Sequence, residues 1–172
     1  MNAPEGAFCF NIALSDKEGF SGFFRNKVSH TNSLHKVNLS SKDSIGISAS
    51  REDDDFNYSE SFNSEIKVPT TTLDSFTKLH GINLIDLLKI DVQGAEALVL
   101  AGGSRILQGT RAVVVEIIFY DYYEEQSSFL EIERILHPLG FRLFSISELS
   151  HNPMNGRTDW AEVIYVNKGL AN

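Results

Sequence analysis

The chain has little cysteine and a shortage of positive charge. Cys9 is the only cysteine in 172 residues, so no internal disulfide can form. The 15 Lys and Arg residues are outnumbered by 23 Asp and Glu residues, and the formal net charge is -8. Nucleic acids and anionic membranes are bound through basic surface, so this acidity argues against both as partners. A small-molecule partner is compatible with it.

Long apolar runs and a signal peptide are also lacking. The longest apolar stretches, residues 84–90 and 112–119, are far shorter than the roughly 20 residues that a membrane-spanning helix needs. Residues 1–6 have neither the basic start nor the apolar run of a signal peptide. We therefore expect a cytoplasmic protein. The length and the hydrophobic content of 42% are those of one globular domain, which we place at residues 1–172.

Periodicity is poor in one long polar stretch, residues 25–67. It is rich in Ser, Asn and Asp and contains the acidic run at residues 52–55. A structureless segment of this length is uncommon inside a domain and is usually a lid, a binding loop or disordered. We expect a long loop or lid here, with the acidic run facing water rather than holding a metal.

Outside this stretch, apolar segments of strand and helix length alternate. Runs such as residues 84–90 and 112–118 are typical of strands buried on both faces of a parallel sheet. The alternation predicts an α/β fold with an open, mostly parallel sheet and helices on its faces. Strands are expected at residues 8–14, 20–24, 84–90, 112–118, 141–146 and 160–166, and helices at 73–81, 95–107 and 127–139.

Turn and capping residues refine this outline. The turn at residues 15–19 suggests that the first two strands form a hairpin, and turn formers at residues 153–156 suggest that the last two pair as an antiparallel hairpin. Thr72 or Asp74 could cap the first helix. The pair Gly102-Gly103 either interrupts the second helix or ends it and starts another.

Acidic residues follow two of the predicted strands. In open α/β sheets, ligands bind beyond the carboxyl ends of the strands, and the strand ending at Ile90 delivers Asp91, Gln93 and Glu96 there. Asp91 could accept a proton from a substrate hydroxyl or hold a ligand, or it could order the turn into the next helix. Glu96 could share that function, or it could simply complement the dipole of the helix that it begins.

Glu116 is an unusual carboxylate within a run of Val and Ile. Buried charges need partners, so Glu116 either pairs with Lys89 across adjacent strands or faces the site. Ala13 and Asp16, after the first strand, lie at the same expected edge. The five histidines have no ligand spacing, and no metal site is predicted from them.

Several segments, in order, resemble one known family. Residues 89–96, Lys-Ile-Asp-Val-Gln-Gly-Ala-Glu, are close to the Lys-Ile-Asp-Val-Glu-Gly-Ala-Glu of the FkbM-type methyltransferases, with Gln93 in place of glutamate. Weaker matches lie at residues 11–16 with Gly19, 33–34, 68–74, 100–103 with Leu107, and 115–116. The resemblance covers residues 8–166 and is most specific in the octamer.

This resemblance implies a Rossmann-like methyltransferase sheet and S-adenosyl-L-methionine (SAM) as the cofactor. It implies O-methylation of a hydroxyl on a sugar or small metabolite, with a small molecule or glycan as the acceptor. Asp91 would lie near the methyl donor or acceptor, and Asp16 or the backbone beside Ala13 near the adenine. The catalytic candidates are Asp91, Glu96 and Glu116, and the cofactor-binding candidates are Ala13, Asp16 and Asp91.

The family's Gly-rich first turn has no counterpart, because the sequence contains no Gly-x-Gly. The fold is therefore expected to be incomplete at its N-terminus, and this chain alone is expected to bind SAM poorly, since bare backbone lets a cofactor approach closely. Two other functions remain open. The chain could be a truncated non-catalytic remnant or binding module, or a metal-dependent enzyme that uses Asp91 and Glu116 as paired carboxylates.

Overall fold

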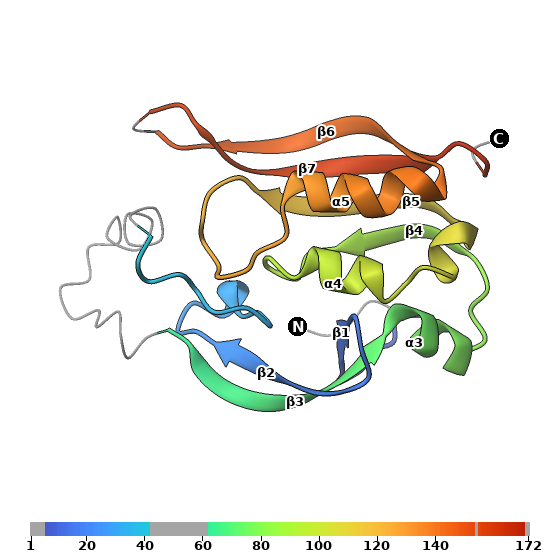
Figure 1. Cartoon of the computed structure of the whole chain (residues 1–172), viewed down its shortest axis with the longest axis horizontal. Helices are drawn as coiled ribbons and strands as arrows, with labels where there is room; N and C mark the ends of the chain where they lie inside the picture. The colour runs from blue at the N-terminus through green and yellow to red at the C-terminus, as the bar shows by residue number, and fades with distance from the viewer. Residues whose placement is uncertain (1–5, 42–61, 154, 171–172) are drawn as a thin grey trace.

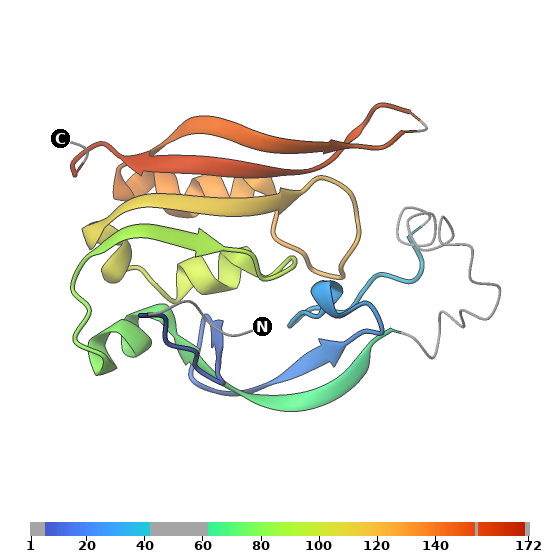
Figure 2. The ribbon, with the colours of Figure 1, turned by 180° about the vertical axis from the view of Figure 1, so that it is seen from behind.

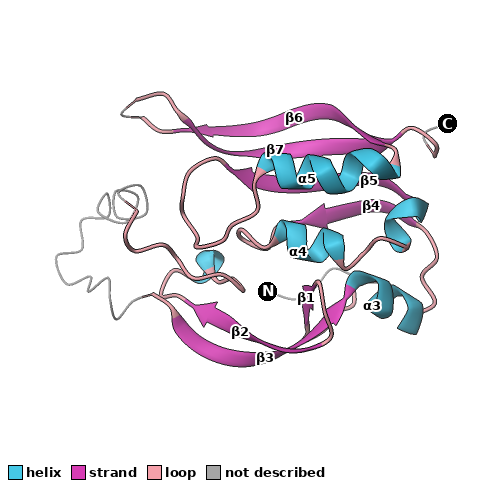
Figure 3. Cartoon of the chain, viewed as in Figure 1, coloured by secondary structure: helices cyan, strands magenta, loops and turns pink. Residues whose placement is uncertain are grey.

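Two β-sheets with short helices organise the chain (Figures 1 and 3). The computed structural model describes residues 6–41, 62–153 and 155–170. Within them the fold is mixed α/β, as the alternation of apolar segments indicates. The expectation of one open sheet is wrong for these residues, because the strands divide into a sheet of three and a sheet of four.

The sheet of three has its last strand in the middle. β3 (Ser64–Thr72) pairs in parallel with β1 (Ala13–Ser15) and antiparallel with β2 (Gly19–Arg25). The predicted hairpin of the first two strands is therefore wrong, because β3 lies between them and pairs with both. The predicted first strand is also too long, since residues 8–12 lie outside β1.

The polar stretch 25–67 is partly ordered where the structure describes it. It contains a 3-10 helix, η1 (Ser29–Thr31), and its last residues belong to β3 rather than to a loop. Isolated bridges join Phe24 to Ser33 and Val37 to Tyr123. The acidic run 52–55 lies outside the described residues, and the role of the stretch as a lid stays a prediction.

The sheet of four has the order β4-β5-β7-β6. β4 and β5 run parallel, whereas β7 is antiparallel to both of its neighbours. The expectation of a mostly parallel sheet is therefore wrong here. The connection between the last two strands is too short for the crossover that a parallel pair needs. The bounds are β4 (Ile85–Ile90), β5 (Thr110–Ile118), β6 (Phe141–His151) and β7 (Thr158–Asn167).

Two of the α-helices are preceded by a residue whose side chain caps them. Thr72 precedes α3 (Leu73–Leu79), and its Oγ1 accepts the backbone N–H of Ser75 at 3.0 Å. Ser128 forms a capping box with Glu131 at the start of α5 (Phe129–Leu136), which a 3-10 turn, η3 (His137–Leu139), extends. Among the described residues, no helix has the length and apolarity to cross a bilayer. The cytoplasmic location stays a prediction.

Gly102 and Gly103 end one helix before another begins. The predicted helix 95–107 is divided into α4 (Glu96–Ala101) and a 3-10 turn, η2 (Ile106–Gly109). A Cβ at Gly102 would fall well inside van der Waals contact with the carbonyl oxygen of Ser15 in β1. Glycine therefore allows the end of α4 to approach the sheet of three.

Helices α4 and α5 pack against the same face of the sheet of four, and the view from behind shows its strands in front of them (Figure 2). Side chains on the helix side are buried, including Val113, Val115 and Ile117. On the other side Leu87 is 61% exposed. The prediction that residues 84–90 and 112–118 are buried on both faces is therefore wrong within the described residues, because α4 and α5 share one face.

Candidate active site

A tight turn, residues 91–95, connects β4 to α4 and carries the predicted site residue Asp91. Two consecutive residues have left-handed backbone, Gln93 with φ 57° and Gly94 with φ 94°. A Cβ at Gly94 would also lie 3.0 Å from the ring of Tyr123. Ser127 holds the turn, because its backbone N–H and its hydroxyl donate to the carbonyl of Gly94 at 2.7 and 2.8 Å.

Glu96, a predicted catalytic residue, lies beneath this turn and is 3% exposed. Its Oε1 accepts the backbone N–H of Val92 at 3.3 Å and of Gly94 at 3.0 Å. Burial raises the pKa of Glu96 to about 7. The residue lines neither of the two cavities described below. Its position is that of a residue that orders the turn, and its catalytic role stays a prediction.

This buried carboxyl should make the stability of the chain depend on pH. The pKa of Glu96 rises from the ordinary 4.5 to about 7 on folding, so the folded chain keeps a proton that the unfolded chain has lost. The stabilisation is complete below pH 4.5 and disappears as the pH rises through about 7. The expected loss in free energy of unfolding is on the order of 3 kcal/mol.

Glu96→Gln keeps an accepting oxygen but cannot titrate, so its free energy of unfolding should fall by less over that pH range. Urea unfolding of both proteins from pH 4.5 to pH 8 measures this difference in free energy of unfolding. Other titrating groups, such as His35 with its pKa lowered by burial, are present in both proteins, so their contributions cancel. The exposed Glu124→Gln is the control and should follow the unmodified chain. Parallel pH profiles for Glu96→Gln and the unmodified chain would contradict the prediction.

Three side chains form a continuous hydrogen-bonded chain at the carboxyl ends of β4 and β5. The amide nitrogen of Gln93 donates to Oδ1 of Asp91 at 2.9 Å and to Oε1 of Glu116 at 3.0 Å. Two of the carboxylates predicted from the sequence, Asp91 and Glu116, are therefore brought together. Gln93, which joins them, was expected from the sequence at the same edge, though not as a catalytic or cofactor-binding residue.

Glu116 is half-buried, and burial is the main reason why its pKa is raised. The charge of Asp91 acts in the same direction, while the hydrogen bond from Gln93 opposes it. Lys89, one expected partner of Glu116, forms its ion pair with Glu162 on β7 and lies 3.9 Å from Asp91. A carboxyl whose pKa is moved towards neutrality is suited to act as a general base.

An apolar cavity of about 570 Å³ opens beside Asp91, within the size range of ligand sites. Ala13 and Asp91, both predicted to contact the cofactor, line it. Asp16, the third such residue, is not among the lining residues, and its Oδ1 accepts the hydroxyl of Ser15 at 3.0 Å. The apolar walls come from the sheet of three and from the residues that precede it, and they include Phe10, Ile12, Leu14, Phe23, Ile66 and Val68.

A second cavity, of about 460 Å³, opens beside Glu116. We call it the aromatic cavity, because Tyr120, Tyr122 and Trp160 line it together with Glu116, Gln93, Asp159, His30 and His151. Asp159 is paired with Arg157, with an N–O distance of 3.0 Å. The Asp91–Gln93–Glu116 chain thus reaches from the lining of the apolar cavity to that of the aromatic cavity.

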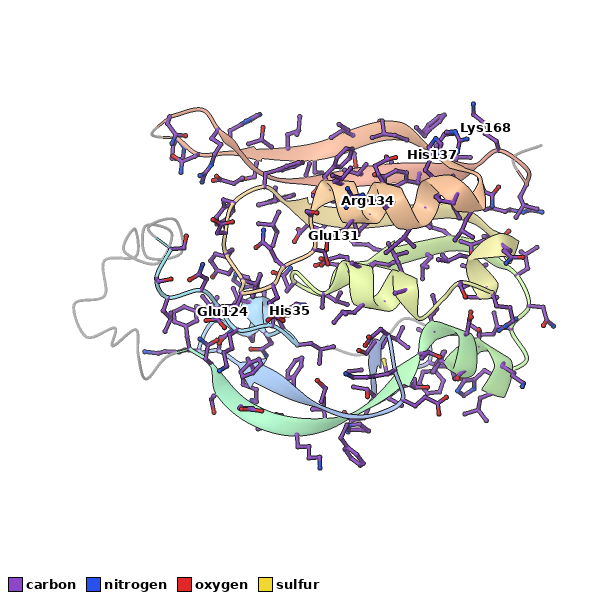
Figure 4. The ribbon with its side chains drawn as sticks, viewed as in Figure 1. His35, Glu124, Glu131, Arg134, His137 and Lys168 are labelled. Atoms are coloured by element: carbon purple, nitrogen blue, oxygen red, sulfur yellow. The ribbon has the colours of Figure 1, made fainter. Side chains whose placement is uncertain are left out.

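A described part of the polar stretch 25–67 packs beside the aromatic cavity. His35 lies near Glu124 (Figure 4), where the backbone N–H of Glu124 donates to the carbonyl of Lys36 at 2.8 Å. The hydroxyl of Ser33 donates to the carbonyl of Gln93 at 2.7 Å. These bonds connect the stretch to the turn after β4 and to the loop after β5.

Several lining residues were not predicted from the sequence. Trp160, His30 and His151 were not proposed as site residues from the sequence, and all three line the aromatic cavity. Tyr120 was expected near the site, because it follows the carboxyl end of a predicted strand, and the same signal could have indicated Tyr122. Within the described residues, no group of three or more His, Cys, Asp or Glu side chains is arranged to hold a metal ion.

Comparisons with known proteins match the chain to a methyltransferase family. Residues 2–143 match the family described as the methyltransferase FkbM domain. Over 65 residues the chain is 42% identical to 2-O-methyltransferase NoeI of Sinorhizobium fredii (strain NBRC 101917 / NGR234), a match that covers 38% of this chain and 27% of that protein. The chain therefore spans about a quarter of the length of this curated relative. No solved structure matches the chain.

Proposed function

This chain belongs to the methyltransferase FkbM domain family, and from that premise we propose that it takes part in SAM-dependent methylation of a hydroxyl oxygen on a saccharide or a related small polyol. The observation that carries the proposal is the Asp91–Gln93–Glu116 chain between the two cavities. A methyl donor bound in the apolar cavity and a methyl acceptor bound in the aromatic cavity could therefore meet at this pair of carboxylates.

The apolar cavity has the chemistry expected of a place for part of the cofactor. Its apolar walls, among them Phe10 and Phe23, suit a flat ring, and the carboxylate of Asp91 at its edge suits a cationic or hydroxyl group. The lining includes Ala13 and Asp91, as the family resemblance implies. When bound, SAM supplies an electrophilic methyl group on a positively charged sulfur.

The aromatic cavity has the chemistry expected of an acceptor site. Aromatic rings such as Trp160 present apolar faces to the C–H side of a sugar, while carboxylates and imidazoles bind its hydroxyls. Glu116 would take the proton of the attacking hydroxyl as its oxygen bonds to the methyl carbon, while the bond from that carbon to sulfur would break and the neutral thioether would leave. The relative named above is a 2-O-methyltransferase, which supports an oxygen acceptor.

The experiment that tests this proposal maps two ligands on the isotope-labelled chain by NMR. SAM at millimolar concentration, which allows for weak binding, should shift amide signals of residues in the apolar cavity, including Ala13 and Asp91. A neutral oligosaccharide should instead shift signals of the aromatic cavity. Saturable binding of both ligands without any methyl transfer would favour the binding-module alternative, and shifts confined to other surfaces would overturn the proposal.

Trp160 provides an independent measurement of acceptor binding. It is the only tryptophan in the sequence and it lines the aromatic cavity, so its fluorescence should change when a saccharide binds. A phosphorylated saccharide should bind at least about tenfold more weakly than its neutral counterpart at low salt, because Glu116 and Asp91 repel anions. Equal affinities, or fluorescence that does not respond to any saccharide, would count against this acceptor site.

A further inference from the structure

The amide of Gln93 uses all of its hydrogen-bonding groups within the site. Its two N–H groups bind one carboxylate each, Asp91 at 2.9 Å and Glu116 at 3.0 Å. Its oxygen lies 2.9 Å from the hydroxyl of Tyr123, which can donate to it. Burial raises the pKa of Tyr123 well above its usual range, so this hydroxyl keeps its proton. The opposite amide orientation would place the carbonyl oxygen against two carboxylates, so the network fixes which atom is nitrogen.

The backbone at Gln93 is held in a conformation that non-glycine residues seldom adopt. Its φ is 57°, a left-handed value that costs a side-chain-bearing residue about 1 kcal/mol. The carbonyl accepts the hydroxyl of Ser33 at 2.7 Å, and Gly94 is fixed by Ser127 on the other side. Strain of this kind persists where surrounding contacts enforce it and is typical of functional positions.

Glutamine is chemically distinct here from the glutamate that stands at this place in the family's octamer. A glutamate would be a third carboxylate between Asp91 and Glu116, and even when protonated it could donate its single O–H to only one of them. The amide donates at any pH. We propose that Gln93 is a positioning residue whose side-chain amide holds the carboxyl groups of Asp91 and Glu116 beside each other, so that Glu116 is placed to accept the acceptor's proton. This inference rests on the proposed function.

The other charged groups around Glu116 do not supply the hydrogen bond that the Gln93 amide donates to it. Lys89 on β4 is engaged with Glu162, which lies opposite Glu116 on β7 and adds negative charge. His30, His151 and the Arg157-paired Asp159 line the same cavity. Gln93 is the donor for which a hydrogen bond to Glu116 is observed among the described residues.

The test is an NMR titration of the side-chain carboxyl carbons in the full chain and its variants. In Gln93→Met, which has a similar length but no donor, Glu116 should bind its proton about one pH unit higher than in the unmodified chain. In Gln93→Glu, the three neighbouring carboxyls should titrate jointly, and one of them should stay protonated to a still higher pH. Gln108→Glu adds the same charge at an exposed position and should leave the titration of Glu116 unchanged.

Methyl transfer gives the second readout. The rate with Gln93→Glu should fall as the pH rises through the range in which the added carboxyl loses its proton, whereas the unmodified chain should show no such fall. If Gln93→Met does not fold, Tyr123→Phe removes the hydroxyl that orients the amide and should raise the pH at which Glu116 titrates. An unchanged titration of Glu116 in the folded variants would overturn the inference.

The two proposals can fail separately. If Glu116 titrates at a higher pH in Gln93→Met but the unmodified chain binds no saccharide, the role of Gln93 is supported and the proposed function is overturned. Saccharide binding and methyl transfer with an unchanged pH profile in Gln93→Glu would support the function and remove the role of Gln93.

Discussion

With SAM supplied at millimolar concentration to offset weak binding, Glu116→Gln should slow methyl transfer by about 100- to 10,000-fold, the range usual for loss of a general base. The substitution preserves the shape of the side chain and an oxygen that can accept the hydrogen bond from Gln93. It removes the carboxylate that would take the proton of the acceptor hydroxyl. Acceptor binding measured by Trp160 fluorescence should change much less than the rate, because the aromatic walls of the cavity remain.

The matched control is Asp86→Asn, which makes the same charge change at an exposed residue near the start of β4. Asp86 pairs with Arg111 at 3.4 Å on the sheet edge opposite the site, so its loss should leave the rate nearly unchanged. Asp91→Asn should abolish transfer, and unchanged transfer would remove Asp91 from the mechanism. A rate for Glu116→Gln within threefold of the unmodified chain would show that another group receives the proton.

Gly102→Ala should lower the free energy of unfolding by about 3 kcal/mol or more, at the upper end of the range for overpacking. The new methyl group would collide with the carbonyl oxygen of Ser15, which is backbone and cannot rotate away. The φ of Gly102 is -73°, which alanine adopts readily, so the effect would come from the collision and not from backbone strain. Ser15 lies in β1 two residues after Ala13, which lines the apolar cavity, so a shift of β1 should also disturb that cavity.

Gly81→Ala provides the comparison for this prediction. A Cβ at Gly81 meets no atom within 4 Å, and its φ of 68° carries only the conformational penalty of about 1 kcal/mol. Urea unfolding of both variants should therefore rank Gly102→Ala as clearly less stable. Equal free energies of unfolding for the two variants would contradict the prediction. They would mean that β1 and the end of α4 can move apart at little cost in free energy.

The site as a whole is assembled where both sheets and the polar stretch meet. Ser33 binds the carbonyl of Gln93, and Tyr123 contacts the amide of the same residue. Asp91 lines a cavity whose other walls come largely from the sheet of three. A change in the spacing of the two sheets would therefore alter the apolar cavity before it altered the hydrogen bonds between Asp91, Gln93 and Glu116.

The local order of the chain could be predicted from the sequence because its signals act over a few residues. Thr72 caps α3, Gly102 and Gly103 end α4, and β4 and β5 coincide closely with the two apolar runs. The octamer at residues 89–96 identified the family, and the matching of residues 2–143 to the FkbM domain confirms it. The same octamer placed Asp91 at the end of a strand, where ligands gather.

Sheet pairing and the composition of the cavities were decided by tertiary structure, since hydrogen bonds between strands join residues far apart in sequence. β3 takes its place between β1 and β2 through such bonds, so a pattern that looked like a hairpin forms none. Trp160, 69 residues after Asp91 in the printed numbering, comes to the site because β7 pairs with β5. The sequence by itself determined the family, the local elements and the place of Asp91. Only the folded chain puts the Gln93 amide between Asp91 and Glu116, because that contact depends on the left-handed turn after β4 and the parallel register of β4 and β5.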